Sequence, residues 1–163
     1  MARKLKKLPL KRKRLGKTDY KKRLALISGN KPRLVVRRFS KNIIAQIVEF
    51  HPDGDKVVVS AHTNELKKKF GMTMPKKNIT SAYLIGLLVG KKASQKKIKN
   101  AVLDIGLQRP VKGSLLFAVV KGAVDAGIDV PHSKEILPDE KRIKGEHLKK
   151  SEYETMRKKI IGA

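Results

Sequence analysis

Residues 33–63 read RLVVRRFSKNIIAQIVEFHPDGDKVVVSAHT, and this stretch contains three strand signals in succession. The segments 33–40, 43–50 and 56–63 are rich in Val and Ile, whose branched side chains pack well on a pleated surface. A short polar pair separates the first two segments. Asp53-Gly54, before the third, is a strong hairpin signal. The stretch therefore predicts an antiparallel meander of three strands.

Alternation along the first predicted strand assigns its side chains to two faces of the sheet. Arg33, Val35, Arg37 and Phe39 share one face, and Leu34, Val36, Arg38 and Ser40 share the other. Neither set is fully apolar. We therefore expect the end of this strand to reach solvent or a partner, with Arg37 and Arg38 pointing to opposite sides.

The residues before the meander predict a helix over 20–28. Thr18 is a candidate N-cap, and the following Asp19 suits the positive end of a helix. Tyr20, Leu24 and Ile27 recur at helical spacing and predict the packed face. The neighbouring basic side chains would then line the outer surface.

The residues after the meander predict a fourth strand and further helices. The segments are 64–77, helical only in part; 78–89, a helix closed by Gly90; 101–105, a strand; 114–126, a helix capped by Ser114; and 151–161, a last helix. A helical crossover can place the fourth strand parallel to a neighbour. We therefore predict an α/β fold with a mixed, mostly antiparallel sheet and packed helices on one or both faces.

The charge of the chain is its most extreme property. Lys and Arg number 40 against 14 Asp and Glu, which gives a net charge of +26, and residues 1–23 alone contain twelve basic residues and one acid. Such density cannot be buried, because each buried cation would need a partner. A polyanion is the expected partner. An anionic membrane would favour an amphipathic basic helix, whereas Pro9 and Gly16 interrupt this run.

Several other classes of protein are disfavoured. The chain has no cysteine and four widely spaced histidines, so neither disulfides nor a zinc site are expected. The N-terminus lacks the apolar region of a signal peptide. The longest apolar stretch, residues 82–89, is far shorter than the roughly 20 residues that span a bilayer. We expect a soluble intracellular protein without a cofactor.

Two patterns resemble catalytic motifs, and neither is convincing. Gly86 to Lys92 has the wrong glycine spacing for a phosphate-binding loop and closes a helix instead of opening one. Asp104 ends a strand, where a carboxylate could hold magnesium in a nuclease, but no second acid is expected to converge on it. A salt bridge or turn contact is the favoured role of Asp104. We predict no active site.

The distribution of basic residues favours nucleic acid, and the aromatic content favours folded RNA. Basic residues cluster in the N-terminal arm and first helix, at the end of the first strand, and in loops that include Arg109 and Lys112. Only 4% of residues are aromatic, so stacking on bases is limited to residues such as Tyr20 and Phe39. Folded RNA is recognised by shape and phosphate position. A general nucleic-acid packaging protein is the alternative.

These observations divide the chain into three expected parts. Residues 1–17 would form a disordered basic arm, residues 18–130 an α/β RNA-binding core, and residues 131–163 an extended C-terminal segment with a terminal helix.

Several separated motifs also resemble a known family. They are Gly16-Lys-Thr-Asp-Tyr-Lys-Lys-Arg-Leu24, Lys31-Pro-Arg-Leu-Val-Val-Arg-Arg38, Asn42-Ile-Ile-Ala-Gln-Ile47, Ala101-Val-Leu-Asp-Ile-Gly-Leu-Gln-Arg-Pro110, Ala123-Val-Asp-Ala-Gly-Ile-Asp-Val-Pro-His132, Ile136-Leu-Pro-Asp-Glu140 and Arg142-Ile-Lys-Gly-Glu-His147. Together they resemble the universal large-subunit ribosomal protein that binds 5S ribosomal RNA, number eighteen in bacteria and number five in eukaryotes. The arm and the segment after Pro131 resemble the archaeal form.

The resemblance implies a structural role without catalysis or cofactor. The protein would sit in the large subunit of cytoplasmic ribosomes and attach 5S rRNA to 23S rRNA in the central protuberance. Its other partners would be neighbouring ribosomal proteins, including other 5S-binding proteins. The residues implied to contact RNA are Arg3, Lys4, Arg12, Lys13, Arg14, Lys17, Tyr20, Lys21, Arg23, Arg33, Arg37, Arg38, Ser40, Lys41 and Asn42, with Arg109, Lys112 and Ser114 as a second set.

Overall fold

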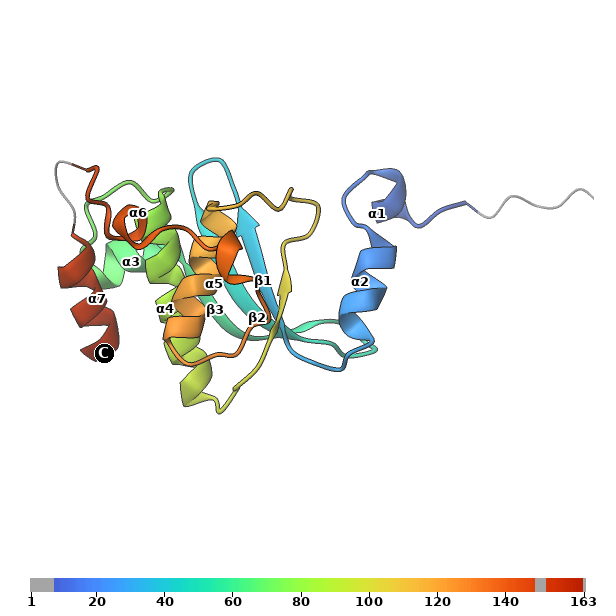
Figure 1. Ribbon diagram of the computed structural model, residues 1–163. Coiled ribbons are helices and arrows are strands. Elements are labelled where there is room, and N and C mark those ends of the chain that lie inside the picture. Colours follow the sequence, from blue (N-terminus) through green and yellow to red (C-terminus); the bar gives the residue numbers. More distant parts are fainter. Residues whose placement is uncertain (1–7, 149–151, 163) are drawn as a thin grey trace, which may run out of the picture.

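The computed structural model describes residues 8–148 and 152–162. Its elements, in chain order, are α1 (Lys11–Arg14), α2 (Tyr20–Ile27), β1 (Arg33–Arg38), β2 (Ile43–Glu49), β3 (Lys56–His62), α3 (Thr63–Phe70), α4 (Ile79–Gln95), β4 (Val102–Asp104), α5 (Leu115–Asp125), the 3-10 helix η1 (Lys134–Ile136), α6 (Glu140–Lys144) and α7 (Tyr153–Gly162). Figure 1 shows the sheet between α1 and α2 at one end and the remaining helices at the other.

The four strands form one mixed sheet in the order β3-β2-β1-β4. β2 pairs antiparallel with both β1 and β3, whereas β4 joins the outer side of β1 in parallel. The predicted α/β fold, its meander and its parallel fourth strand are therefore confirmed. The parallel pairing sets Val35 opposite Asp104, which brings that carboxylate to the edge of β1.

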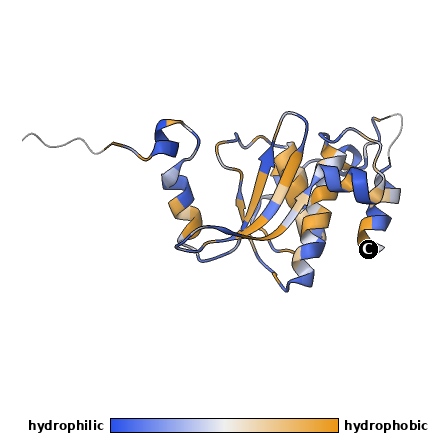
Figure 2. Cartoon of the chain, turned by 180° about the vertical axis from the view of Figure 1, so that it is seen from behind, coloured by the Kyte–Doolittle hydropathy of each residue, from blue (hydrophilic) through white to orange (hydrophobic). Residues whose placement is uncertain are grey.

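One face of the sheet forms the core and the opposite face remains largely open. Leu34, Val36, Ala45, Ile47 and Ala61 are buried on the first face. Helices α4 and α5 cover this face, and their apolar residues continue the hydrophobic layer seen in Figure 2. Helices therefore bury only one of the two faces.

Glycines allow α4 and α5 to pack closely. A Cβ at Gly86 would lie 2.2 Å from the carbonyl oxygen of Val119, and one at Gly122 would lie 2.2 Å from that of Tyr83. Such distances mean that the two backbones touch.

The structure also corrects the predicted end of helix α4. Gly90 lies inside α4, where an added Cβ would meet Ala126, and the helix continues to Gln95 instead of ending at Gly90.

Helix α2 differs from the prediction in its cap and its packed face. Asp19, not Thr18, is the N-cap, and its carboxylate accepts a hydrogen bond from the Lys22 amide at 3.1 Å. Leu24, expected on the packed face, is 69% exposed. Arg23 instead turns toward the sheet, where it pairs with the Asp55 carboxylate.

The C-terminal helices extend the core on the far side of α4. Tyr153, Met156 and Ile160 of α7 are buried, as is Ile143 of α6. The last predicted helix and the partly helical 64–77 segment are both present, as α7 and α3. The sequence did not predict α1, which lies within the expected arm.

Candidate nucleic-acid interface

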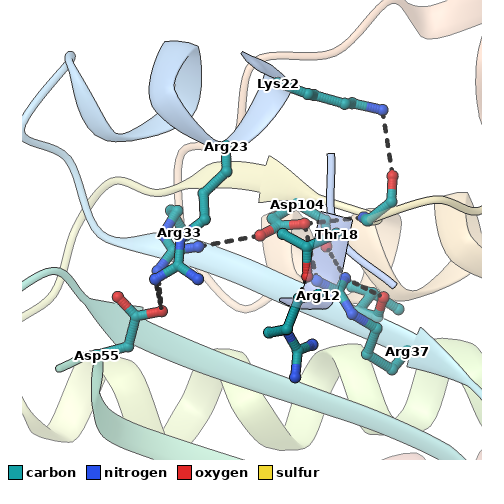
Figure 3. A network of polar contacts seen from close by, with 10 residues as sticks. Arg12, Thr18, Lys22, Arg23, Arg33, Arg37, Asp55 and Asp104 are labelled. Carbon is teal, nitrogen blue, oxygen red and sulfur yellow. Dashed lines mark hydrogen bonds and ion pairs between the residues drawn. The ribbon is translucent and has the colours of Figure 1, made fainter. Parts of the chain in front are cut away.

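A network of charged side chains lies on the open face of the sheet. The Arg33 guanidinium pairs with Asp104 at 3.1 Å and with Asp55 at 2.7 Å (Figure 3). Arg33 is only 4% exposed. Two carboxylates from different strand ends therefore compensate this buried cation, which links β4 to the β2–β3 hairpin.

Arg37 completes the network beside β4. Its guanidinium donates to the Asp104 carboxylate at 2.9 Å and to the Asp104 carbonyl oxygen at 2.6 Å. Gly106, which has a φ of +63°, donates its amide to the same carboxylate at 2.8 Å. Burial by itself would raise the pKa of Asp104, but the charge of Arg37 and these hydrogen bonds prevail, so its pKa lies below the ordinary value. Asp104 thus has the predicted salt-bridge role.

Helix α2 approaches the same face through polar contacts. Arg23 pairs with Asp55 at 2.8 Å, and the Lys22 ammonium reaches the Gly106 carbonyl oxygen at 3.4 Å. Between α2 and the sheet lies a cleft of about 470 Å³, whose lining includes Arg12, Lys17 and Arg37. Its walls therefore combine basic side chains from the arm with the strand network.

The arm ends at this cleft. Arg12 of α1 donates through Nε to the Thr18 hydroxyl at 2.9 Å. Lys13 and Arg14 are exposed on α1, and Lys17 is exposed at the cleft. Tyr20 is half-buried at the start of α2, whereas Lys21 is exposed. Arg3 and Lys4, which the sequence also assigned to RNA contact, lie outside the described residues.

The turn between β1 and β2 presents a second group of the expected contact residues. Ser40 and Lys41 are exposed, while Asn42 is half-buried and accepts a hydrogen bond from the Thr63 hydroxyl. The Lys77 ammonium donates to the Ser40 carbonyl oxygen at 3.2 Å. This turn therefore presents the exposed Lys41 cation next to a backbone carbonyl that the Lys77 hydrogen bond stabilises.

The last group is split between a loop and a groove. Arg109 and Lys112 are exposed in the loop between β4 and α5. Ser114 and Arg38 line a groove together with residues that were not predicted from the sequence to belong to a site: Lys77, Asn78, Arg142 and His147. Two features of the sequence could have indicated these groove residues: the helix-start pattern at Asn78 and the cations of the 142–147 motif. Their placement side by side in the groove depends on how the helices pack.

Other classes of site find little support in the described part of the chain. No group of three or more His, Asp or Glu side chains there could hold a metal ion. None of the helices within residues 8–148 and 152–162 combines the length and apolar character needed to cross a bilayer.

The geometry defines a basic α/β protein with an open, cation-lined sheet face, of the kind that binds a structured polyanion. A family model described as ribosomal large subunit proteins 60S L5 and 50S L18 matches residues 4–100 and 91–133. The chain belongs to this family. It is therefore a ribosomal protein of the large subunit, located with cytoplasmic ribosomes, and its partners are ribosomal RNA and ribosomal proteins. The family is a structural one and not a family of enzymes.

Proposed function

We propose that this protein binds 5S rRNA and attaches it to 23S rRNA in the central protuberance. The observation that supports this proposal best is the cleft between the arm, α2 and the open sheet face, because it gathers cations from three separate parts of the chain. Phosphates of a folded RNA can be contacted at several points by such a surface. We further propose that the protein is of the archaeal type, on the resemblance of its arm and C-terminal segment.

The contacts divide the basic residues into two functional groups. Arg33 is buried between two carboxylates, so we propose that it holds the surface in shape and does not touch RNA. Lys13, Arg14, Lys17 and Lys41 are exposed, and we propose that they meet phosphates. We propose that Arg37, which is already paired with Asp104, also binds a phosphate that approaches from the open face of the sheet.

A binding titration tests the proposal. The full-length protein is titrated against 5S rRNA and against an unrelated RNA of equal length at several salt concentrations. If about six phosphates are neutralised, the logarithm of the affinity should fall with the logarithm of salt at a slope of about −4 to −5. The affinity for 5S rRNA should exceed that for the control RNA throughout.

Two results would contradict the proposal. Equal affinity for the two RNAs would exclude specific recognition of 5S rRNA. Equally tight binding to duplex DNA would instead indicate a general packaging protein. Attachment to 23S rRNA is tested separately, by asking whether 5S rRNA joins 23S rRNA only when the protein is added.

A further inference from the structure

A second basic site lies apart from the cleft, at the end of the molecule where β1 turns into β2. A groove of about 380 Å³ is lined there by Arg38, Lys77, Arg142 and His147, which come from three different segments. All four side chains are exposed. Among the described residues, the groove lining contains no Asp or Glu, whereas Asp19, Asp55 and Asp104 line the cleft. The basic charge of the groove is therefore not offset by its own walls.

Two helices begin at this groove. Asn78, which lines it, is the N-cap of the 17-residue helix α4, and Ser114, which also lines it, is the N-cap of the 11-residue helix α5. The first amides of a helix have no acceptor within the helix, and the helix dipole makes this end favourable for an anion. Both effects therefore add to the charge of the surrounding side chains.

Two buried polar atoms at the groove lack a partner within the described residues. The Asn78 side chain accepts from the Ser81 amide at 2.6 Å through its oxygen, which leaves its amide nitrogen as a donor without an acceptor. The Ser114 hydroxyl makes no capping bond and has no other partner. Buried donors without acceptors are costly, so they point to a missing acceptor.

We propose that this groove binds a backbone phosphate of 5S rRNA, in addition to the cleft. A phosphate supplies the acceptor oxygens that both orphan donors lack, and its charge matches the cations Arg38, Lys77 and Arg142. RNA is favoured over an acidic protein segment because ribosomal RNA is a partner of this family and carries a phosphate at every nucleotide. The proposal of RNA as the ligand rests on the proposed function.

The first experiment maps the site with inorganic phosphate, independently of any RNA. Phosphate is added to the isotope-labelled full-length protein, and backbone amide shifts are recorded by NMR. The largest shifts should fall on the first amides of α4 and α5, at Ile79, Thr80, Leu115 and Leu116. Ser114→Ala and Arg142→Gln should reduce these shifts. Shifts spread over all basic surfaces, or shifts unaffected by both substitutions, would overturn the site.

The second experiment tests the RNA ligand. Arg142→Gln should weaken 5S rRNA binding about tenfold and make the salt slope shallower by about 0.7–0.9. Arg157→Gln removes the same charge from the exposed surface of α7 and should have an effect of twofold or less. Equal losses in the two variants would overturn the inference. Loss of binding to a neighbouring ribosomal protein, with RNA binding unchanged, would assign the groove to a protein partner instead.

The two proposals can fail separately. A wild-type protein that does not prefer 5S rRNA contradicts the proposed function, whatever the phosphate titration shows. A wild-type protein that prefers 5S rRNA, with Arg142→Gln indistinguishable from Arg157→Gln, contradicts the groove as an RNA site and leaves the proposed function intact.

Discussion

Asn78 and Ser114 occupy equivalent N-cap positions, but only one of the two side chains makes a capping hydrogen bond. Asn78 accepts a hydrogen bond from the Ser81 amide, whereas the Ser114 hydroxyl bonds to nothing within the described residues. The Asn78 side chain therefore stabilises the start of α4, whereas the start of α5 receives no hydrogen bond from its N-cap side chain. A residue can thus occupy the N-cap position without its side chain capping the helix.

This difference predicts unequal effects of alanine at the two caps. Asn78→Ala should lower the free energy of unfolding by about 1 kcal/mol, because the Ser81 amide loses its acceptor. Ser114→Ala should change it by less than about 0.5 kcal/mol, because no hydrogen bond is removed. Urea denaturation without phosphate or RNA measures both. A loss at Ser114 as large as that at Asn78 would mean that the hydroxyl does cap the helix.

Asp104 makes the stability of the fold depend on pH. Its pKa is lowered in the folded state, so its contribution is complete above the unfolded pKa of about 3.9 and is lost as the pH falls through the folded value. Asp104→Asn should therefore cost about 3 kcal/mol near neutral pH, since Arg33 and Arg37 lose a charged partner. The difference from wild type should shrink on acidification below pH ~4.

Denaturant unfolding at several pH values gives the measurement. Asp53→Asn is the matched control, because Asp53 is exposed at the β2–β3 turn and Asn-Gly forms such a turn equally well. It should change stability by less than about 0.5 kcal/mol. A cost of Asp104→Asn that stays constant from about pH 3 to pH 7 would contradict the ionised pair.

At the scale of elements, the close contact of α4 and α5 depends on glycine. Gly86→Ala would place a Cβ 2.2 Å from the Val119 carbonyl oxygen, so the helices must move apart. We expect a loss of about 2–3 kcal/mol, as for overpacked cores, although alanine favours helix. Gly29→Ala is the control, since a Cβ there meets nothing within 4 Å. Thermal unfolding compares the two, and equal stability of both variants would contradict the contact.

The strands were predictable to within two residues of their ends, because alternation and the Asp53-Gly54 turn are local signals. The end of α4 was not. Gly90 resembles a helix stop in sequence, yet it packs against Ala126 of the segment that ends α5, and only tertiary structure reveals this use. Arg33 and Asp104 likewise form their pair only because β4 lies parallel to β1. The basic arm could be predicted from composition. Predicting the groove would have required knowing that α4 and α5 begin side by side.

At the scale of the whole molecule, charge and fold are separated in space. With 40 Lys and Arg against 14 Asp and Glu, the chain cannot neutralise itself, and two of its acids, Asp55 and Asp104, pair with the buried Arg33 of the sheet. The core beneath α4 and α5 is apolar and continuous. Much of the uncompensated charge therefore lies on the arm, the turns and the groove, where it costs the fold little.

This separation predicts that the arm serves binding and not stability. None of the residues of α1 is buried, so deletion of residues 1–17 should change the free energy of core unfolding by less than about 1 kcal/mol. The same deletion should weaken 5S rRNA binding and make the salt slope shallower by about 0.7–0.9 for each phosphate that the arm neutralises in the intact protein. A full-length variant with Lys11, Arg12, Lys13 and Arg14 replaced by Gln is the charge control, and it should reproduce part of the change in slope. A deletion variant that unfolds cooperatively at much lower denaturant would show that the arm packs as part of the core, and an unchanged salt slope would show that it does not meet phosphate.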